Sequence, residues 1–404
     1  MNAPNRWLAI LGIGEDGVEG LSAAARSLIG EAVLVVGGRR HLALAGGLIT
    51  GSRLAWPSPL AGAFPAILAQ RGHPVVVLAS GDPYCHGIAT TLAGLVALEE
   101  IQTLPAPSAF SLACARLGWA LQDTATISFC GRPLAAIAPL LQPGARILAL
   151  SADAATPAQL AALLSASGFS PSRLHLLEAL GGPSERVRTI IAEAGLPDDI
   201  SPLNLVGVEV SALAGARILP LTAGLADDSF EHDGQITRRE VRAVTLSALA
   251  PRRGELLWDI GAGCGSVSIE WMLRHPANRA IAIEHRPDRA ARVLRNSLAL
   301  GVPALRVLIG PAPGALDGLP PPDAVFIGGG AQSAGVLPLA WAALRLGGRM
   351  VANAVTIETE AVLFQAVREH GGTLTRLSVE RLDNIGRMHA FRPAMPVTQW
   401  AAVK

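Results

Sequence analysis

The stretch LLWDIGAGCGSVSIEWM, residues 256–272, decides the fold of the second half of the chain. An apolar run carries the acid Asp259 near its end, three alternating glycines follow, and a helix-like apolar pattern begins at Ser266. Such a strand–turn–helix unit is typical of nucleotide-binding α/β sheets, whose ligands lie at the carboxyl ends of the strands. The rest of the sequence has to show which ligand uses this turn.

Length and composition predict a two-domain α/β protein. The chain has 404 residues, of which 50% are hydrophobic and 16% charged, enough to fill two close-packed cores. With a net charge of +1, the chain lacks the overall positive charge that is typical of nucleic-acid-binding proteins. An anionic ligand would therefore have to be bound by arginines close to it. The four cysteines are scattered without a C-x-x-C pair, so the sequence indicates neither a zinc site nor a disulfide framework, and we expect no bound metal.

Short apolar runs alternate with helical patterns along residues 1–215, the first predicted domain. This alternation predicts a largely parallel sheet covered on both faces. We expect strands over residues 7–14, 33–38, 74–83, 146–153 and 203–210, and helices over residues 20–32, 87–100 and 157–168.

Residues 216–237 have no clear period and combine Pro, Gly and acids, so we place the linker there. A second α/β domain, residues 225–404, then begins, and the alternating tail of residues 373–403 predicts an antiparallel pair of edge strands. We expect helices over residues 237–249, 266–273, 287–299, 335–346 and 358–370, and strands over residues 255–260, 280–285, 306–310, 323–329 and 349–355.

Two apolar segments could be mistaken for targeting or membrane segments. Residues 1–17 have an apolar core of only eight residues followed by acids, which indicates a first strand rather than a signal peptide. Residues 324–344 are uncharged but contain a GGG run, a Gln-Ser pair and a proline, which favours strand, loop and buried helix over a membrane span. We therefore expect a soluble cytoplasmic protein.

The glycine turn does not fit a phosphate-binding motif. A dinucleotide fingerprint needs a third glycine where Ser266 stands, and a P-loop needs a Gly-Lys pair that is absent. The order acid-x-G-x-G-x-G resembles the S-adenosylmethionine turn of Rossmann-like (class I) methyltransferases. That ligand has no phosphates, and Asp259 would face its cationic amino-acid end. Glu284, 23 residues after Gly261, suits a contact to ribose hydroxyls.

Two sets of motifs extend this resemblance over nearly the whole chain. GQITRREVRAVTLSAL, the glycine turn, FIGGG and RMVANAVTIET resemble the C15-methylating, decarboxylating domain of corrin biosynthesis. GIGEDGVEGLS, VVGGRRHL, ASGDPYCHGIATTL, APSAFSLACARLG and FCGRP resemble the tetrapyrrole (class III) methyltransferases, specifically the corrin C5-methylating domain. The order of both sets is similar to the precorrin-6Y C5,15-methyltransferase (decarboxylating) family.

The resemblance implies a class III module followed by a Rossmann-like class I domain, each with its own S-adenosyl-L-methionine. Two departures are visible: Gly310-Pro311-Ala312-Pro313 lacks the usual acid after its glycine, and FCGRP replaces a more usual HGR. The implied cofactor-binding residues are Gly12, Gly14, Gly81, Asp82, Pro83 and Ser108 in the first half, and Thr237, Asp259, Gly261, Ala262, Gly263, Cys264, Gly265, Glu284 and Ala312 in the second.

Methyl transfer from a sulfonium to an enamine-like carbon requires mainly alignment, so no Ser-His-Asp or Cys-His set is expected. Asp82, Arg238 and Arg239 are the candidates near the chemistry. Decarboxylation requires that the reacting acetate be poorly solvated while the other carboxylates of the tetrapyrrole are held by forked arginines. Candidates for that contact are Arg39, Arg40 and His41 in the first half, and Arg238, Arg239, Arg242, Arg252 and Arg253 in the second.

Several residues also have a structural interpretation. Thr237 and Glu240 fit an S/T-x-x-E capping box at a helix start. Asp82 equally suits a turn cap, His86 and His389 are weak candidates for proton handling, and Trp258 and Trp271 are expected in the core.

The alternatives left open are a cobalt-loaded corrin or a tRNA base as acceptor, a nicotinamide-dependent oxidoreductase, and a first half that only presents substrate. The expected partner is a small tetrapyrrole, with no nucleic acid and no membrane. Because related modules often assemble, we expect a homo-oligomer.

Overall fold

The computed structural model describes residues 6–404. Contacts divide the chain into two compact units. The first unit runs to Leu134 and continues from Gln142 to Arg217. The second unit comprises Ile218–Lys404 together with the short segment Ala135–Leu141.

The first unit begins with a five-stranded parallel sheet in the order β3-β2-β4-β1-β5. Buried side chains of α1 and α2 cover one face, and those of α3 and α4 cover the other. The elements are β1 (Leu8–Ile13), α1 (Ala23–Glu31), β2 (Leu34–Gly37), α2 (Arg39–Leu44), β3 (Ser52–Ala55), α3 (Phe64–Leu68), β4 (Val75–Ser80), α4 (Ala89–Leu92) and β5 (Ile101–Leu104).

A second sheet completes this unit, in the order β6-β7-β10-β8-β9, and only its β6–β7 pair is parallel. The expectation of one largely parallel sheet was therefore wrong for the second part of the unit. There β8 returns directly into β9 as a hairpin, which requires antiparallel pairing. The elements are α5 (Ala109–Leu117), β6 (Thr124–Ser128), β7 (Arg146–Leu150), α6 (Thr156–Ala166), β8 (Arg173–Glu178), β9 (Arg186–Ile191) and β10 (Asn204–Glu209).

The helix expected over residues 87–100 was also wrong in extent. Only Ala89–Leu92 is α-helical, and a 3-10 turn at Leu98–Glu100 leads into β5. Gly94, two residues after the end of this helix, disfavours its continuation, because glycine costs about 1 kcal/mol in a helix interior.

The second unit contains a seven-stranded sheet in the order β13-β12-β11-β14-β15-β19-β16. The first five strands are parallel, and β19 runs antiparallel to both of its neighbours. The elements are α7 (Arg239–Leu249), β11 (Leu256–Ile260), α8 (Ser266–Leu273), β12 (Arg279–Glu284), α9 (Pro287–Ala299), β13 (Arg306–Ile309), β14 (Ala324–Ile327), α10 (Val336–Ala343), β15 (Arg349–Ala354), α11 (Ile357–His370), β16 (Thr373–Leu377) and β19 (Val397–Val403).

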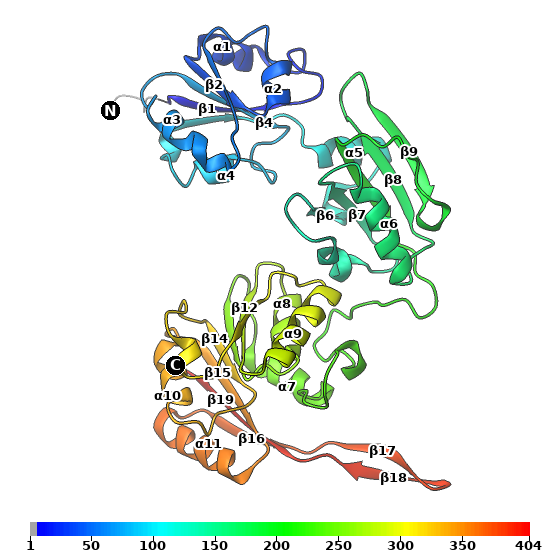
Figure 1. Ribbon diagram of the computed structural model, residues 1–404, viewed down its shortest axis with the longest axis vertical. Helices are drawn as coiled ribbons and strands as arrows, with labels where there is room; N and C mark the ends of the chain where they lie inside the picture. The colour runs from blue at the N-terminus through cyan, green and yellow to red at the C-terminus, as the bar shows by residue number, and fades with distance from the viewer. Residues whose placement is uncertain (1–5) are drawn as a thin grey trace. The chain divides into compact units, whose positions relative to one another are not determined.

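Two buried clusters cover the two faces of this sheet, with α7, α8 and α9 on one face and α10 and α11 on the other (Figure 1). Trp258 and Trp271 are 2% and 0% exposed, which confirms that both belong to the core. Leu219, Leu225 and Phe230 are buried in the same core, so most of the segment interpreted as a linker is packed into the second unit.

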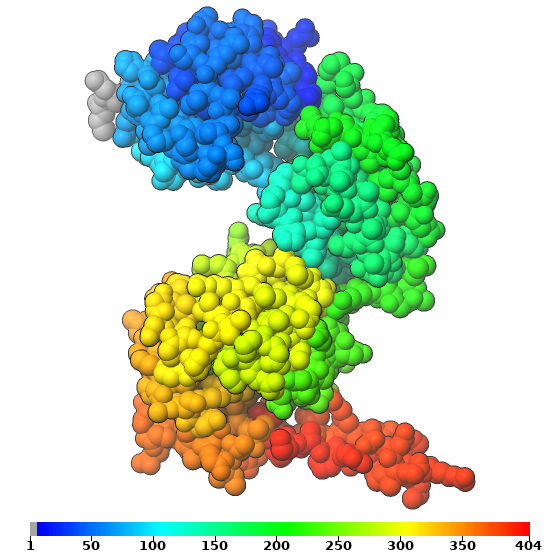
Figure 2. Space-filling view, viewed as in Figure 1, coloured from blue at the N-terminus to red at the C-terminus, as the bar shows by residue number. Residues whose placement is uncertain are grey.

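The tail differs from the expected pair of edge strands. It forms β16 at the edge, β19 inside the sheet, and a separate hairpin of β17 (Glu380–Ile385) and β18 (Met388–Pro393) between them. This hairpin projects from the body of the second unit (Figures 1 and 2). Among residues 6–404, no helix is long and apolar enough to span a membrane.

Candidate active sites

The glycine turn of the second unit is shaped by close backbone contacts. The amides of Gly261 and Ala262 both donate to the carbonyl of Ile283, which ties the turn to the end of β12. Gly261 has a φ of +72°, and a Cβ there would lie 2.7 Å from the carbonyl oxygen of Gly329. A Cβ at Gly265 would meet the side chain of Val293 at 2.6 Å. Glycine is thus required both by conformation and by space.

Glu284, at the end of β12, fastens the same turn from the side. One carboxylate oxygen accepts from the amide of Gly263 at 2.9 Å, and the other accepts from the amide of Arg286 at 2.9 Å. The carboxylate is 2% exposed yet lines the cavity. Each oxygen retains a lone pair, so the predicted contact to a ribose is chemically open to it.

Asp259 lies deeper than expected. Its Oδ2 accepts from the amide of Ser268 at 3.1 Å and from the Ser268 hydroxyl at 2.5 Å, so it holds the first turn of α8. Burial, with a smaller effect from Glu284, raises the pKa of Asp259 to about 6. Its side chain is not part of the cavity wall, nor are Cys264 and Gly265. Asp259 therefore supports the helix that follows the turn, and the direct cofactor contact expected for these three residues stays a prediction.

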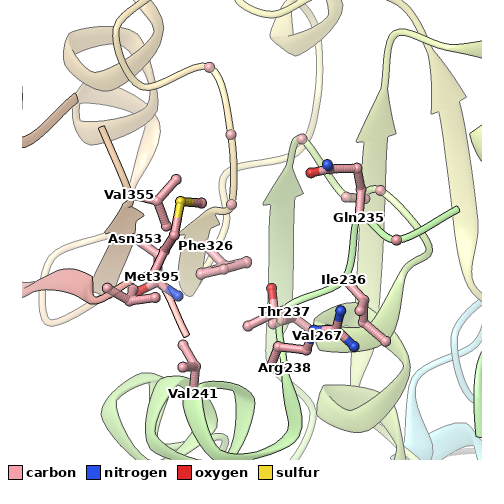
Figure 3. A pocket seen from close by; sticks show the side chains of 18 of the residues that line it. Gln235, Ile236, Thr237, Arg238, Val241, Val267, Phe326, Asn353, Val355 and Met395 are labelled. Atoms are coloured by element: carbon pink, nitrogen blue, oxygen red, sulfur yellow. The ribbon is translucent and has the colours of Figure 1, made fainter. Parts of the chain in front are cut away.

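A cavity of about 1060 Å³ opens beside the turn. One part is formed by the glycine turn, Glu284 and the loops after β13 and β14. The other part is formed by β15, β16 and the root of the hairpin, and Figure 3 shows Asn353, Val355 and Met395 on the side away from Gln235 and Ile236. The structure brings these predicted residues to the wall: Thr237, Arg238, Gly261, Ala262, Gly263, Glu284 and Ala312.

The part of the cavity near the hairpin is mainly apolar with arginines around it. Val355, Leu377, Val379, Met395 and Val397 provide the apolar surface. The sequence analysis missed three of the four arginines: Arg381 and Arg392 lie on a hairpin that it did not predict, and Arg289 lies on a predicted helix whose place beside the cavity is not visible in local patterns. The arginines, with their carboxylate partners, are Arg238 with Asp227 at 3.5 Å, Arg289 with Asp233 at 2.9 Å, Arg381 with Glu240 at 2.5 Å and Arg392 with Asp383 at 2.9 Å.

Arg242 was predicted to bind substrate carboxylates, and this prediction was wrong. The side chain is 0% exposed and donates to Glu270 at 2.6 Å and to Asp227 at 3.2 Å, and its guanidinium lies 4.8 Å from the centre of the Phe230 ring. It is on the inner face of α7, one residue after Val241 and three before Thr245, both buried. A charged residue at a core position of an amphipathic helix is the signal that could have indicated a buried ion pair.

Other arginine predictions also need correction. Arg252 and Arg253 precede β11, at the edge of the sheet opposite to the cavity, since the cavity lies at the carboxyl ends of the strands. Arg239 is exposed and does not line the cavity. The capping box is not formed either: α7 begins at Arg239, and its N-cap residue is Arg238 without a side-chain cap. Thr237 therefore lies one residue before the cap.

The corresponding turns of the first unit pack tightly against one another. A Cβ at Gly12 would fall 1.9 Å from the carbonyl oxygen of Gly81 and 2.4 Å from the amide of Ala106. The amide of Gly81 donates to the carbonyl of Ile13, and that of Ala106 donates to the carbonyl of Gly81. The chain segments that follow β1, β4 and β5 thus meet at the carboxyl edge of the parallel sheet.

The remaining first-unit candidates have local roles in this edge. Asp82 accepts from the amide of Tyr84 at 2.8 Å, so it closes the turn as its structural interpretation predicted. Ser108 caps α5 through the amide of Ser111 at 3.1 Å. Pro83 is buried. A Cβ added at Gly14 would lie 2.6 Å from a carboxylate oxygen of Asp16.

The two histidines considered for proton handling lie elsewhere. His86 is exposed, has a φ of +55° and packs edge-on against Phe110 with ring centres 5.9 Å apart. His389 lies exposed on β18, opposite Asn384. Within residues 6–404, no group of three or more His, Cys, Asp or Glu side chains could hold a metal ion.

Comparison with known proteins follows the division into two units. Residues 8–194 match the family model described as tetrapyrrole (corrin/porphyrin) methylases, and residues 228–404 match the model of a precorrin methyltransferase domain. In a crystal structure, the C-terminal domain of precorrin-6Y C5,15-methyltransferase from Rhodobacter capsulatus is 46% identical, with a TM-score of 0.44 over 46% of this chain and 100% of that one.

Two curated relatives match nearly the whole chain. The precorrin-6Y C(5,15)-methyltransferase [decarboxylating] of Sinorhizobium sp is 58% identical over 398 residues, which cover 98% of this chain and 96% of the relative. The protein of the same name from Mycobacterium tuberculosis (strain CDC 1551 / Oshkosh) is 40% identical over 405 residues, covering 98% and 100%. The chain therefore belongs to the precorrin-6Y C5,15-methyltransferase (decarboxylating) family.

Proposed function

We propose that this protein methylates precorrin-6Y at C5 and C15 and removes the carboxyl group of the ring-C acetate, giving precorrin-8X in cobalamin biosynthesis. The observation that carries this proposal is the 58% identity with a relative of that name along 98% of the chain. The cavity of the second unit supports it, because it joins a glycine turn to a chamber whose wall combines apolar side chains with arginines.

The proposal assigns C5 methylation to residues 1–215 and C15 methylation with decarboxylation to residues 225–404. The two family models match along the same division. Each unit has glycine turns at the carboxyl edge of a parallel sheet, so we assign one S-adenosylmethionine to each. The residues of the second unit fit such a ligand, because a close backbone approach at Gly261–Gly263 stands beside the carboxylate of Glu284.

When bound, S-adenosylmethionine supplies an activated methyl group on a sulfonium. The protein then has to hold the acceptor carbon in line with it, and orientation of this kind contributes about 7–11 kcal/mol. In the second unit, Glu284 and Ile283 fix the turn from two directions. The acceptor would lie in the chamber next to Asn353, Val355 and Met395.

For decarboxylation, we assign different roles to the apolar side chains and to the arginines of the same chamber. Bound substrate would displace water from Val355, Met395 and Val397, and a carboxylate held against them would then lose solvation, which favours its departure as carbon dioxide. The ring system, once protonated, takes the electron pair. Arg238, Arg381 and Arg392 at the rim would hold the other carboxylates through forked contacts.

We further propose that the protein works as a soluble cytoplasmic homo-oligomer without nucleic acid. A two-stranded hairpin alone is marginally stable in water. The β17–β18 hairpin nevertheless exposes Leu382, Ile385, Met388 and Phe391, at 55–72% each. Burial of these side chains between copies of the chain would stabilise the hairpin.

The test is mass spectrometry of products formed by the full chain from metal-free precorrin-6Y and S-adenosylmethionine without oxygen. The expected product has gained two methyl groups and lost one carbon dioxide. Unchanged substrate, with S-adenosylmethionine still bound to the protein, would contradict the assignment of the acceptor. A parallel reaction with the cobalt-loaded substrate separates the two acceptors.

A further inference from the structure

A compact polar cluster lies at the carboxyl edge of the parallel sheet of the first unit. Arg40 and His41 are in the first turn of α2, directly after β2, and Ser80 is the last residue of β4. Glu15 follows β1 and forms an ion pair with Arg40. Ser80 precedes Gly81, so the cluster adjoins the turns assigned to the methyl donor.

The hydrogen bonds of this cluster determine the protonation of His41. Arg40 Nη2 lies 3.1 Å from His41 Nε2, and a guanidinium can only donate, so Nε2 is the accepting nitrogen. The Ser80 hydroxyl accepts from Arg40 Nη2 at 3.1 Å and lies 2.8 Å from the same Nε2. The hydroxyl therefore donates its own proton to His41.

The charge of the cluster agrees with this assignment. Burial, with a smaller effect of the Arg40 charge, lowers the pKa of His41 to about 4, so the ring is neutral near pH 7. Arg40 is compensated by Glu15. The sequence analysis predicted that Arg40 and His41 bind substrate carboxylates, whereas a neutral His41 offers a base.

Methylation of a meso carbon that carries hydrogen needs such a base. Methyl transfer breaks the S–CH3 bond, leaves its electron pair on sulfur, and forms the C5–CH3 bond with the π electrons of the substrate. C5 then carries both hydrogen and methyl, next to a cationic, iminium-like system. Breaking the C5–H bond returns its electrons to the ring and restores conjugation. A weak base suffices, because the cation makes this proton strongly acidic.

We propose that Ser80 and His41 form the proton acceptor for methylation in the first unit: the Ser80 oxygen takes the C5 proton while its own proton passes to His41 Nε2. Ser80 is exposed, so it can meet a substrate, whereas His41 is half-buried behind it. Arg40 and Glu15 act as positioning residues that keep Nε2 free of a proton in the resting state. This inference rests on the proposed C5 methylation.

The test measures methylation at C5 with precorrin-6Y that carries deuterium at C5. The full-length variants His41→Gln and Ser80→Ala are compared with the wild type and with a matched control, His73→Gln. His73 is exposed in the loop before β4. General-base catalysis contributes about 100-fold or more, so kcat for the C5 methylation should fall by about that factor in His41→Gln, with KM unchanged. Both test variants should show a primary deuterium isotope effect and accumulate a methylated species that retains the label.

His73→Gln should match the wild type, and C15 methylation and decarboxylation should continue in all variants. Equal rates without an isotope effect in both test variants would overturn the proton-acceptor role. A loss confined to KM would overturn it too, in favour of carboxylate binding. Ser80→Ala removes one oxygen at an exposed position, so it tests the same proton acceptor even if His41→Gln fails to fold. If the wild type transfers no methyl to C5, the proposed function itself fails, and this outcome is distinct from the others.

Discussion

The two units prepare the carboxyl edge of a parallel sheet in different ways. In the second unit, Glu284 at the end of the neighbouring strand accepts a hydrogen bond from the turn, and the buried Asp259 accepts from the first turn of the following helix. In the first unit, Gly12 and Gly81 pack backbone on backbone, and the carboxylate of Glu15 is engaged by Arg40. Close packing is thus common to the turns of both units, tightest at Gly12, and the second unit adds the carboxylates of Glu284 and Asp259.

This difference predicts which substitutions inactivate the turn of each unit. A turn that depends on packing fails when volume is added, whereas a turn that depends on carboxylates fails when charge is removed. Substitutions of the two kinds should therefore inactivate the units separately, although both are proposed to use the same methyl donor.

The largest effect is expected from Gly12→Ala, because the new Cβ would stand 1.9 Å from the Gly81 carbonyl oxygen. C5 methylation should fall below detection while C15 methylation and decarboxylation persist, as measured by product mass. Gly47→Ala is the control, since nothing lies within 4 Å of its Cβ position. Normal C5 methylation by Gly12→Ala would show that the turn is not tightly packed.

Arg242→Met should destabilise the second unit by about 3–5 kcal/mol, because it leaves Glu270 buried without its ionic partner. The measurement is the free energy of unfolding in urea, followed by tryptophan fluorescence, to which the buried Trp258 and Trp271 of this unit contribute. Arg253→Met, an exposed change, should stay within about 0.5 kcal/mol. Equal stability of the two variants would contradict the buried ion pair.

The stability contribution of Asp259 should depend on pH. Its pKa is raised from near 3.8 to about 6, so between these values the folded protein holds a proton that the unfolded chain has lost. Stability therefore falls as the pH rises through this window, by about 3 kcal/mol for a shift of about two units. Asp259→Asn should lack this component, and the exposed Asp317→Asn should retain it. If the free energy of unfolding depends on pH in the same way in the wild type and in Asp259→Asn, the raised pKa of Asp259 is refuted.

Glu284→Gln should weaken S-adenosylhomocysteine binding by the second unit about 10- to 100-fold. The amide keeps one acceptor oxygen for two backbone amides, and a hydrogen bond to a charged group is worth about 1.5–3 kcal/mol. Calorimetry should show that binding by the first unit is unchanged. A uniform loss at both sites would remove the contrast between the units.

Much of the second unit was predictable because its patterns are local. The helices expected over residues 266–273 and 287–299 have the observed bounds, since an apolar period of 3.6 residues follows a turn or a proline in each. The turn itself was recognisable from its glycines. The contact partners that make Gly261 and Gly265 necessary, Gly329 and Val293, were not, because they come from distant segments.

The misses share a physical cause, which is pairing over long sequence distances. The antiparallel sheet of the first unit depends on register between strands that local patterns do not reveal. In the sequence, Arg242 looks like a surface charge. Its partners Glu270 and Asp227 lie 28 and 15 residues away and meet it only in the folded structure. Arg381 and Arg392 reach the cavity only because a hairpin separates β16 from β19.

The central claim, that each unit binds its own methyl donor, is tested most directly by the stoichiometry of S-adenosylhomocysteine binding to the full chain, measured by titration calorimetry. We expect two sites per chain in the wild type and one in Gly12→Ala. One site per chain in the wild type, unaffected by Gly12→Ala, would contradict the claim and leave the first unit without a donor.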